Sequence, residues 1–218
     1  MADVGSVGGR VAAVVLAAGR GTRFSAGPKL LAPFRGRPLV AWAIDAAGAA
    51  GLDAVVVVTG AVPLAAVLGD APPGVAFVEN PHWHEGQATS LRAGLDWCAR
   101  GGFEAAVVGL GDQPLVPASA WRAVGRSGHA PVVTATFGGV RRPPVRLDAS
   151  AWALLSGWGD EGARELMRRR PDLVGEVACE GDPADVDTLD DLRTLDQSGT
   201  RPGAGESSGS KNEVSEWS

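Results

Sequence analysis

An apolar run of strand length near the amino terminus passes directly into a loop of small residues, glycines and cations. The run begins at Val11 and the loop reaches Lys29. A buried strand followed by such a loop leaves backbone N–H groups unobstructed, which suits a phosphate flanked by cations. The spacing differs from a Walker A loop because Leu30 follows Lys29, and from a dinucleotide fingerprint because Phe24 replaces the last glycine.

Further apolar runs alternate with helical patterns along the first half of the chain. Residues 54–59 and 105–110 are apolar almost throughout, which is typical of parallel strands covered on both faces. Residues 38–50 and 87–99 carry the patterns of helices, the first with proline in its opening turn. This alternation predicts an α/β fold, in which one domain forms a three-layer α/β/α Rossmann-like structure around a mostly parallel sheet.

The alternation of strand and helix patterns becomes less regular after residue 112, and the C-terminal tail shows no periodic apolar pattern. The domain is expected to span residues 11–196, between a flexible N-terminus at 1–10 and a disordered tail at 197–218 that is polar and rich in Gly and Ser. The remaining expected elements are helices over 62–68, 117–124, 160–170 and 188–195, and strands over 75–78, 131–136, 144–147 and 173–179.

Composition excludes several classes of protein. The net charge of −5 argues against a nucleic-acid binder, and no apolar run is long enough for a membrane span or a signal peptide. Two cysteines, Cys98 and Cys179, form neither a disulfide framework nor a metal spacing, so a cytoplasmic location is expected. Five cations within 18 positions, without a carboxylate among them, indicate a small anionic ligand: Arg20, Arg23, Lys29, Arg35 and Arg37.

Two carboxylates are predicted to approach the same edge of the sheet as the glycine loop. Asp112 follows the strand at 105–110, and Asp187 lies just before the final helix. Ligands of open parallel sheets bind outside the carboxyl ends of the strands. Mg²⁺ is commonly held by one or two carboxylates together with substrate phosphates, so these residues are candidate metal ligands. The alternative for an isolated Gly-Asp after a strand is a turn or a helix cap.

Motif blocks in order along residues 11–195 resemble the MobA-like nucleotidyltransferase family, in particular its molybdenum cofactor cytidylyltransferase branch. The blocks are L-A-A-G-x-G-x-R with a following P-K, N-P-x-W-x-x-G-x-x-x-S-L, G-D-Q-P, G-D-x-G-A-R and D-x-D-T. The resemblance implies the fold of nucleotide-diphospho-sugar transferases. One departure falls at Arg142, Pro143 and Pro144, where relatives usually carry Gly-His-Pro.

The resemblance also implies roles for individual residues. Arg23 would neutralise the β- and γ-phosphates, Lys29 would lie near the α-phosphate, and Mg²⁺ would be held by Asp112 and Asp187, so that Lys29, Arg23 and Asp112 form the catalytic set. The implied nucleotide-binding residues are Leu16, Ala17, Ala18, Gly19, Gly21, Arg23, Lys29, Asn80, Gly86 and Ser90. The implied second-substrate residues are Gln113, Asp160, Gly162 and Arg164, and Asp160 is also expected to cap a helix.

The activity implied by the resemblance is the Mg²⁺-dependent transfer of CMP from CTP to the phosphate of molybdenum-bound molybdopterin, with release of pyrophosphate. The partners would be CTP or another NTP, a phosphorylated pterin cofactor and, transiently, a molybdoenzyme. Three alternatives remain open: the same chemistry with GTP, a different phosphorylated acceptor, and a non-catalytic carrier of the cofactor. A metal site at His82 and His84 is disfavoured because no third ligand lies nearby in the sequence.

Overall fold

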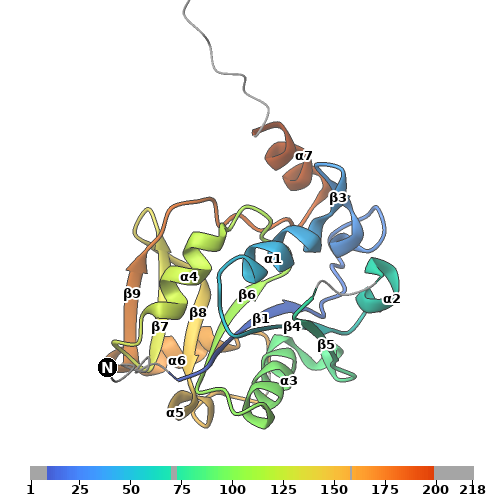
Figure 1. Ribbon diagram of the computed structural model, residues 1–218. Helices are drawn as coiled ribbons and strands as arrows, with labels where there is room; N and C mark the ends of the chain where they lie inside the picture. Colours follow the sequence, from blue (N-terminus) through green and yellow to red (C-terminus); the bar gives the residue numbers. More distant parts are fainter. Residues whose placement is uncertain (1–8, 70–72, 158, 199–218) are drawn as a thin grey trace, which may run out of the picture.

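A seven-stranded sheet forms the centre of the protein in a computed structural model that describes residues 9–69, 73–157 and 159–198 (Figure 1). The strand order is β5-β4-β1-β6-β8-β7-β9. Only β8 runs antiparallel to its neighbours, so the expected mostly parallel sheet is confirmed. The strands are β1 (Val11–Ala17), β4 (Ala54–Thr59), β5 (Val75–Glu79), β6 (Ala105–Leu110), β7 (Val132–Phe137), β8 (Val140–Asp148) and β9 (Val174–Ala178).

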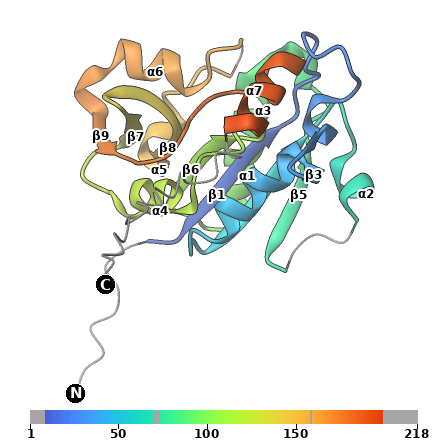
Figure 2. The same ribbon diagram turned by 90° about the horizontal axis from the view of Figure 1, so that it is seen from above.

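Helices cover both faces of the sheet, as the turned view in Figure 2 shows. One face packs against α1 (Leu39–Gly48), α2 (Leu64–Leu68) and α4 (Ala118–Arg126). The other face packs against α3 (Gln87–Arg100), α5 (Ala149–Trp152) and α6 (Ala163–Arg169). Successive residues of a strand point to opposite faces, which is why the central strands are apolar at almost every position. The predicted three-layer α/β/α architecture is confirmed.

A third, smaller apolar cluster holds the C-terminal helix α7 (Leu189–Ser198) against the segment that follows the first loop. Val186, Leu192 and Leu195 pack there with Phe24 and Phe34. Five short elements complete the described part of the chain. They are the hairpin strands β2 (Pro33–Phe34) and β3 (Arg37–Pro38) and the 3-10 turns η1 (Lys29–Leu31), η2 (Trp83–Glu85) and η3 (Pro171–Leu173).

Helix α6, strand β8 and helix α5 differ from the sequence predictions. Helix α6 begins at Ala163 instead of 160, because Gly162 at its N-terminus adopts a positive φ of 51° that helical residues do not take. Strand β8 begins four residues before the predicted 144, because the turn at Gly138 and Gly139 pairs Phe137 directly with Val140. The short helix α5 was not predicted at all.

The bounds of the domain stay a prediction, because they fall close to the ends of the described residues. Helix α7 continues to Ser198, two residues beyond the expected domain end at 196. Residues 1–8 of the expected flexible N-terminus and residues 199–218 of the expected tail lie outside the described residues. Within the described ranges, no helix combines the length and apolar character needed to cross a bilayer.

Candidate functional site

The site lies at the topological switch point of the sheet, between strands β1 and β6. The chain goes from β1 outward to β4 and β5, then returns to place β6 on the other side of β1. At the carboxyl ends of β1 and β6, the Gly111 N–H donates to the Leu16 carbonyl over 2.9 Å. The loop that ends at Lys29 follows β1, and Asp112 follows β6. Ligands of open α/β sheets bind at such a switch point.

Glycine shapes the loop after β1 at Gly21. Its φ is +63°, and a Cβ placed there would lie 2.8 Å from Cβ of Lys29. Any other residue would therefore be strained and would also push against the lysine stem. A hydrogen bond of 2.9 Å from the Phe24 N–H to the Gly21 carbonyl closes the turn, and the buried Phe24 side chain anchors it.

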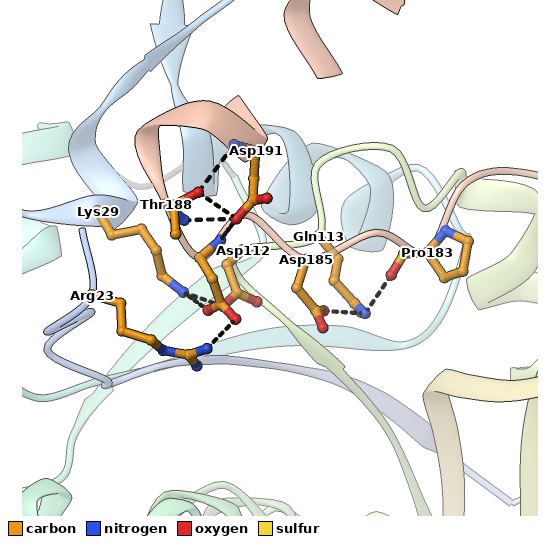
Figure 3. Close-up of polar contacts among 9 residues, drawn as sticks. Arg23, Lys29, Asp112, Gln113, Pro183, Asp185, Thr188 and Asp191 are labelled. Carbon is orange, nitrogen blue, oxygen red and sulfur yellow. Dashed lines mark hydrogen bonds and ion pairs between the residues drawn. The ribbon is translucent and has the colours of Figure 1, made fainter. Parts of the chain in front are cut away.

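Lys29 binds both predicted metal-ligand carboxylates directly. Its Nζ lies 2.6 Å from Oδ2 of Asp112 and 3.2 Å from Oδ1 of Asp187, while Arg23 pairs with the other oxygen of Asp187 at 3.0 Å (Figure 3). Burial alone would lower the pKa of Lys29, but the charge of Asp112 and the hydrogen bonds to both carboxylates outweigh it and raise that pKa. The four side chains form a chain of alternating charge, which we call the ion cluster.

One oxygen of the ion cluster has no partner among the described residues. Oδ1 of Asp112 is buried and accepts no hydrogen bond there. An unpaired buried carboxylate oxygen is costly, and a cation would satisfy it. The described residues contain no group of three His, Cys, Asp or Glu side chains able to hold a metal. Mg²⁺ is commonly held by one or two carboxylates together with substrate phosphates and water, and Asp112 and Asp187 would suffice for such a site.

Asp187 owes its position to the docking of α7. The N–H of Val186 donates to the Asp112 carbonyl over 3.0 Å, which ties the segment before α7 to the end of β6. Thr188 and Asp191 cap the helix reciprocally, with bonds of 2.8 Å from the Thr188 N–H and 3.1 Å from the Asp191 N–H. The Asp187 N–H also donates to Asp191 over 3.1 Å. The cap thus fixes the backbone of the second carboxylate.

Gln113 also holds the segment before α7, through hydrogen bonds of its side chain. Its side chain is buried, and Nε2 donates to the Pro183 carbonyl over 2.9 Å and to Oδ1 of Asp185 over 2.7 Å (Figure 3). Both donor hydrogens are used in this way, and Gln113 lines neither of the cavities described below. The structure therefore places this predicted second-substrate residue as a support of the 183–187 segment. Burial, followed by the charge of Asp112, raises the pKa of Asp185.

A cavity of about 320 Å³, the glycine-loop cavity, lies over the loop and the ion cluster. Its lining includes Lys29 and Asp112 of the ion cluster and Trp83 and His84 of η2. Most of the predicted nucleotide-binding residues line it: Leu16, Ala17, Ala18, Gly19, Gly21, Lys29, Gly86 and Ser90. Arg23 lies outside its lining and reaches the ion cluster through Asp187.

Asn80 does not line the glycine-loop cavity. Its buried amide donates to the hydroxyls of Thr89 and Ser90 over 2.9 and 3.0 Å, and its carbonyl accepts the N–H of His82 over 3.0 Å. These bonds hold the turn between β5 and α3 in shape. Asn80 thus positions Ser90, which does line the cavity.

A second cavity of about 720 Å³, the arginine-lined cavity, adjoins the first through shared lining residues Leu16, Gln87 and Leu110. The predicted second-substrate residues Gly162 and Arg164 line it, but Asp160 lines the glycine-loop cavity instead. Asp160 also makes no capping bond to α6, so its expected role as a cap is wrong; Gly162 occupies the cap position.

Sequence reasoning missed several residues of the site. Asp185 and Arg142 line the arginine-lined cavity, and Gln87 lines both cavities. No local signal identifies Gln87, because its role depends on how α3 packs over the end of β1. Asp191 could have been found, since the T-x-x-D spacing at 188–191 is that of a capping box.

Comparison with known proteins assigns the chain to a family. The model of the MobA-like NTP transferase domain matches residues 13–174, well over half of the chain. Nicotine blue oxidoreductase of Paenarthrobacter nicotinovorans is 33% identical over 200 residues, which cover 85% of this chain and 96% of that protein. The match between the two proteins is therefore close to full length.

Solved structures agree with this assignment. A crystal structure of Rv0371c from Mycobacterium tuberculosis H37Rv has a TM-score of 0.74 and 30% identity, covering 87% of this chain and 98% of that one. A structure of Rv0371c in complex with manganese has a TM-score of 0.70 and 30% identity, covering 87% and 99%. A nucleotidyl transferase from Methanothermobacter, 22% identical with a TM-score of 0.75 over 88% and 98%, supports the fold alone. The chain belongs to the MobA-like NTP transferase family and is an enzyme of the nucleotidyltransferase type.

Proposed function

We propose that this enzyme transfers CMP from CTP to the terminal phosphate of molybdenum-bound molybdopterin and releases pyrophosphate. The observation that carries the proposal is the ion cluster below the glycine-loop cavity, in which Lys29 and Arg23 meet Asp112 and Asp187 at the sheet's switch point. A carrier that only delivers a finished cofactor has no need for a phosphate loop beside paired carboxylates. The choice of CTP and of the pterin acceptor rests on the resemblance of the motif blocks.

The chemistry is a direct displacement at phosphorus. An oxygen of the acceptor phosphate forms a bond to the α-phosphorus, and the bond from that phosphorus to the bridging oxygen breaks. Pyrophosphate leaves with the bonding electron pair. Such transfers are catalysed mainly by positioning and by stabilising negative charge.

The residues of the ion cluster supply both effects in this proposal. The amides of the glycine loop hold the phosphates, Arg23 neutralises the departing pyrophosphate, and Lys29 stabilises charge at the α-phosphate. Asp112 and Asp187 would hold Mg²⁺, which when bound aligns the phosphates and withdraws charge from them. The unpaired Oδ1 of Asp112 fits this role, and the manganese complex of Rv0371c supports a divalent ion in the family.

The adjoining cavities have the arrangement that two substrates need. In the proposal the nucleotide occupies the glycine-loop cavity and the acceptor occupies the arginine-lined cavity. Their shared wall at Leu16, Gln87 and Leu110 is where the two reacting phosphates would meet. A volume of about 720 Å³ lies within the range of ordinary small-molecule sites.

A second candidate activity is the reduction of a nicotine-blue-like pigment. It is favoured by one observation, the 33% identity with nicotine blue oxidoreductase over almost the whole of that protein. An assay that follows reduction of nicotine blue separates this activity from nucleotidyl transfer. Electron transfer without any pyrophosphate release from CTP would favour the second candidate.

Nucleotide choice is tested by thermal unfolding with Mg²⁺ and CTP, GTP, ATP or UTP. A ligand at 100 times its Kd stabilises a protein by about 2.7 kcal/mol, which is readily measured. We expect the largest rise in Tm with CTP. A rise with GTP alone would refute the cytidylyl assignment and leave the transfer chemistry intact.

A further inference from the structure

We propose that Arg142 and Arg164 bind a second anionic group of the acceptor, separate from its reacting phosphate, and so select acceptors that carry two anionic groups. The inference rests on the proposed function for the identity of the cavity's occupant. It goes beyond that function by assigning Arg142, which sequence analysis treated only as a departure from the family pattern.

The arginines that line the arginine-lined cavity fall into two pairs. Arg141 is committed to Glu176, with contacts of 2.7 and 2.6 Å, and Arg168 is committed to Glu161 at 2.6 Å. Arg142 donates only to the carbonyl of the neighbouring residue, over 3.1 Å. Within the described part of the chain, the guanidinium of Arg164 makes no hydrogen bond or ion pair. Among the described residues, two guanidinium groups of the lining are therefore not held in an ion pair, although the charge of Arg164 also acts on Glu161 and Asp185.

A local irregularity of β8 brings Arg142 to this cavity. Thr134 of β7 pairs with Val145 and the next residue pairs with Arg142, so Pro143 and Pro144 have no partners on β7. Proline has no N–H to donate, which makes the interruption tolerable in a strand that lies between two others. The hydroxyl of Thr134 donates to the Arg142 carbonyl over 3.3 Å. Bulges of this kind redirect side chains beside functional sites.

The other lining residues indicate what the uncharged part of the ligand is like. Leu91, Val108, Val145 and Met167 give the cavity an apolar wall that suits a flat ring. The lining also contains two carboxylates, Glu161 and Asp185. Glu161 pairs with Arg168, and one oxygen of Asp185 already accepts from Gln113. The ligand class is therefore a ring compound that carries, besides its reacting phosphate, a carboxylate, a second phosphate or another oxyanion. Guanidinium groups bind such anions with paired, charge-assisted hydrogen bonds.

The test uses two fluorescent probes, pterin-6-carboxylate and unsubstituted pterin, which differ in one anionic group. Binding to the full chain is measured by fluorescence titration. We expect the carboxylate to bind on the order of tenfold more tightly than pterin, and this preference to fall several-fold in Arg142→Gln and in Arg164→Gln. Arg142→Lys should retain part of it, because the charge remains but the fork is lost.

Arg126→Gln is the matched control, because Arg126 is an exposed arginine of α4 that lines neither cavity. It should bind both probes as the unaltered protein does. Equal binding of the two probes, or a preference that survives both glutamine variants, would overturn the inference. Pyrophosphate release from CTP is measured separately. Release without any arginine-dependent preference refutes the inference alone, whereas the preference without release refutes only the proposed function.

Discussion

The two cavities share part of one wall, but they differ in whether the cations beside them are paired with carboxylates. Below the glycine-loop cavity, Lys29 and Arg23 are already matched by Asp112 and Asp187, and the four side chains neutralise one another. In the arginine-lined cavity, Arg142 has no carboxylate partner among the residues that the structure describes. A neutral cluster that must accept a metal and a polyphosphate has to exchange partners when they bind. An unpaired cation is ready for its ligand without such an exchange.

This contrast follows from how the two cavities are built. The ion cluster joins the ends of two parallel strands to a C-terminal helix, so its members come from segments far apart in the chain and hold them together. The cations of the arginine-lined cavity come from the antiparallel strand β8 and the short helix α6. The charged side chains of the first cavity therefore also link distant segments of the chain, whereas the cations of the second cavity come from two elements only.

The largest expected effect comes from Asp112→Asn, which removes the charge of the carboxylate at the end of β6 while keeping its shape. We expect pyrophosphate release to fall on the order of 10³-fold, because both the partner of Lys29 and the proposed metal ligand are lost. The measurement is turnover of CTP with a phosphorylated acceptor, with circular dichroism to show folding. Asp190→Asn, an exposed acid of α7, is the control. Retained turnover would separate the ion cluster from catalysis.

Lys29→Met tests the exchange of partners within the ion cluster. Without the ammonium group, Asp112 and Asp187 repel each other. We expect the free energy of unfolding to fall by roughly 2 kcal/mol, because solvent screens these two half-buried carboxylates only partly. Turnover should fall about 10²-fold, more than CTP binding does. Mn²⁺ alone should raise the Tm of the variant more than that of the unaltered protein, since it replaces the missing ammonium. An equal rise in both proteins would contradict the exchange.

The fold was largely predictable because buried parallel strands have a distinctive composition. The apolar runs at 54–59 and 105–110 were placed correctly to the residue as β4 and β6. The region after Asp112 was harder for a physical reason. Strand β8 carries two prolines in its interior, which local rules assign to the start of a strand, and only its pairing with β6 and β7 makes the interruption tolerable.

The sequence predicted which residues of the site lie near one another, but not which of them are in direct contact. The rule for the carboxyl ends of parallel strands placed Lys29, Asp112 and Asp187 at one edge, and they do meet there. Direct pairing of Lys29 with Asp187 depends on the docking of α7, which no local pattern encodes. Asn80 and Gln113 illustrate the same limit, because motif membership does not tell a ligand contact from a buried support.

The smallest expected effect concerns the cap that fixes the backbone of Asp187. Asp191→Ala removes the acceptor of the Thr188 and Asp187 N–H groups and should cost about 1 kcal/mol, or roughly 2–4 °C in Tm for a chain of this size. Because α7 remains docked through Leu192, the loss should be local, and the affinity for Mn²⁺ should fall more than the stability loss alone explains. Asp190→Ala on the same helix controls for the change in charge. If Mn²⁺ binding in Asp191→Ala matches that control, the ion cluster positions Asp187 by itself, and the C-terminal helix contributes stability to the nucleotide side without shaping its chemistry.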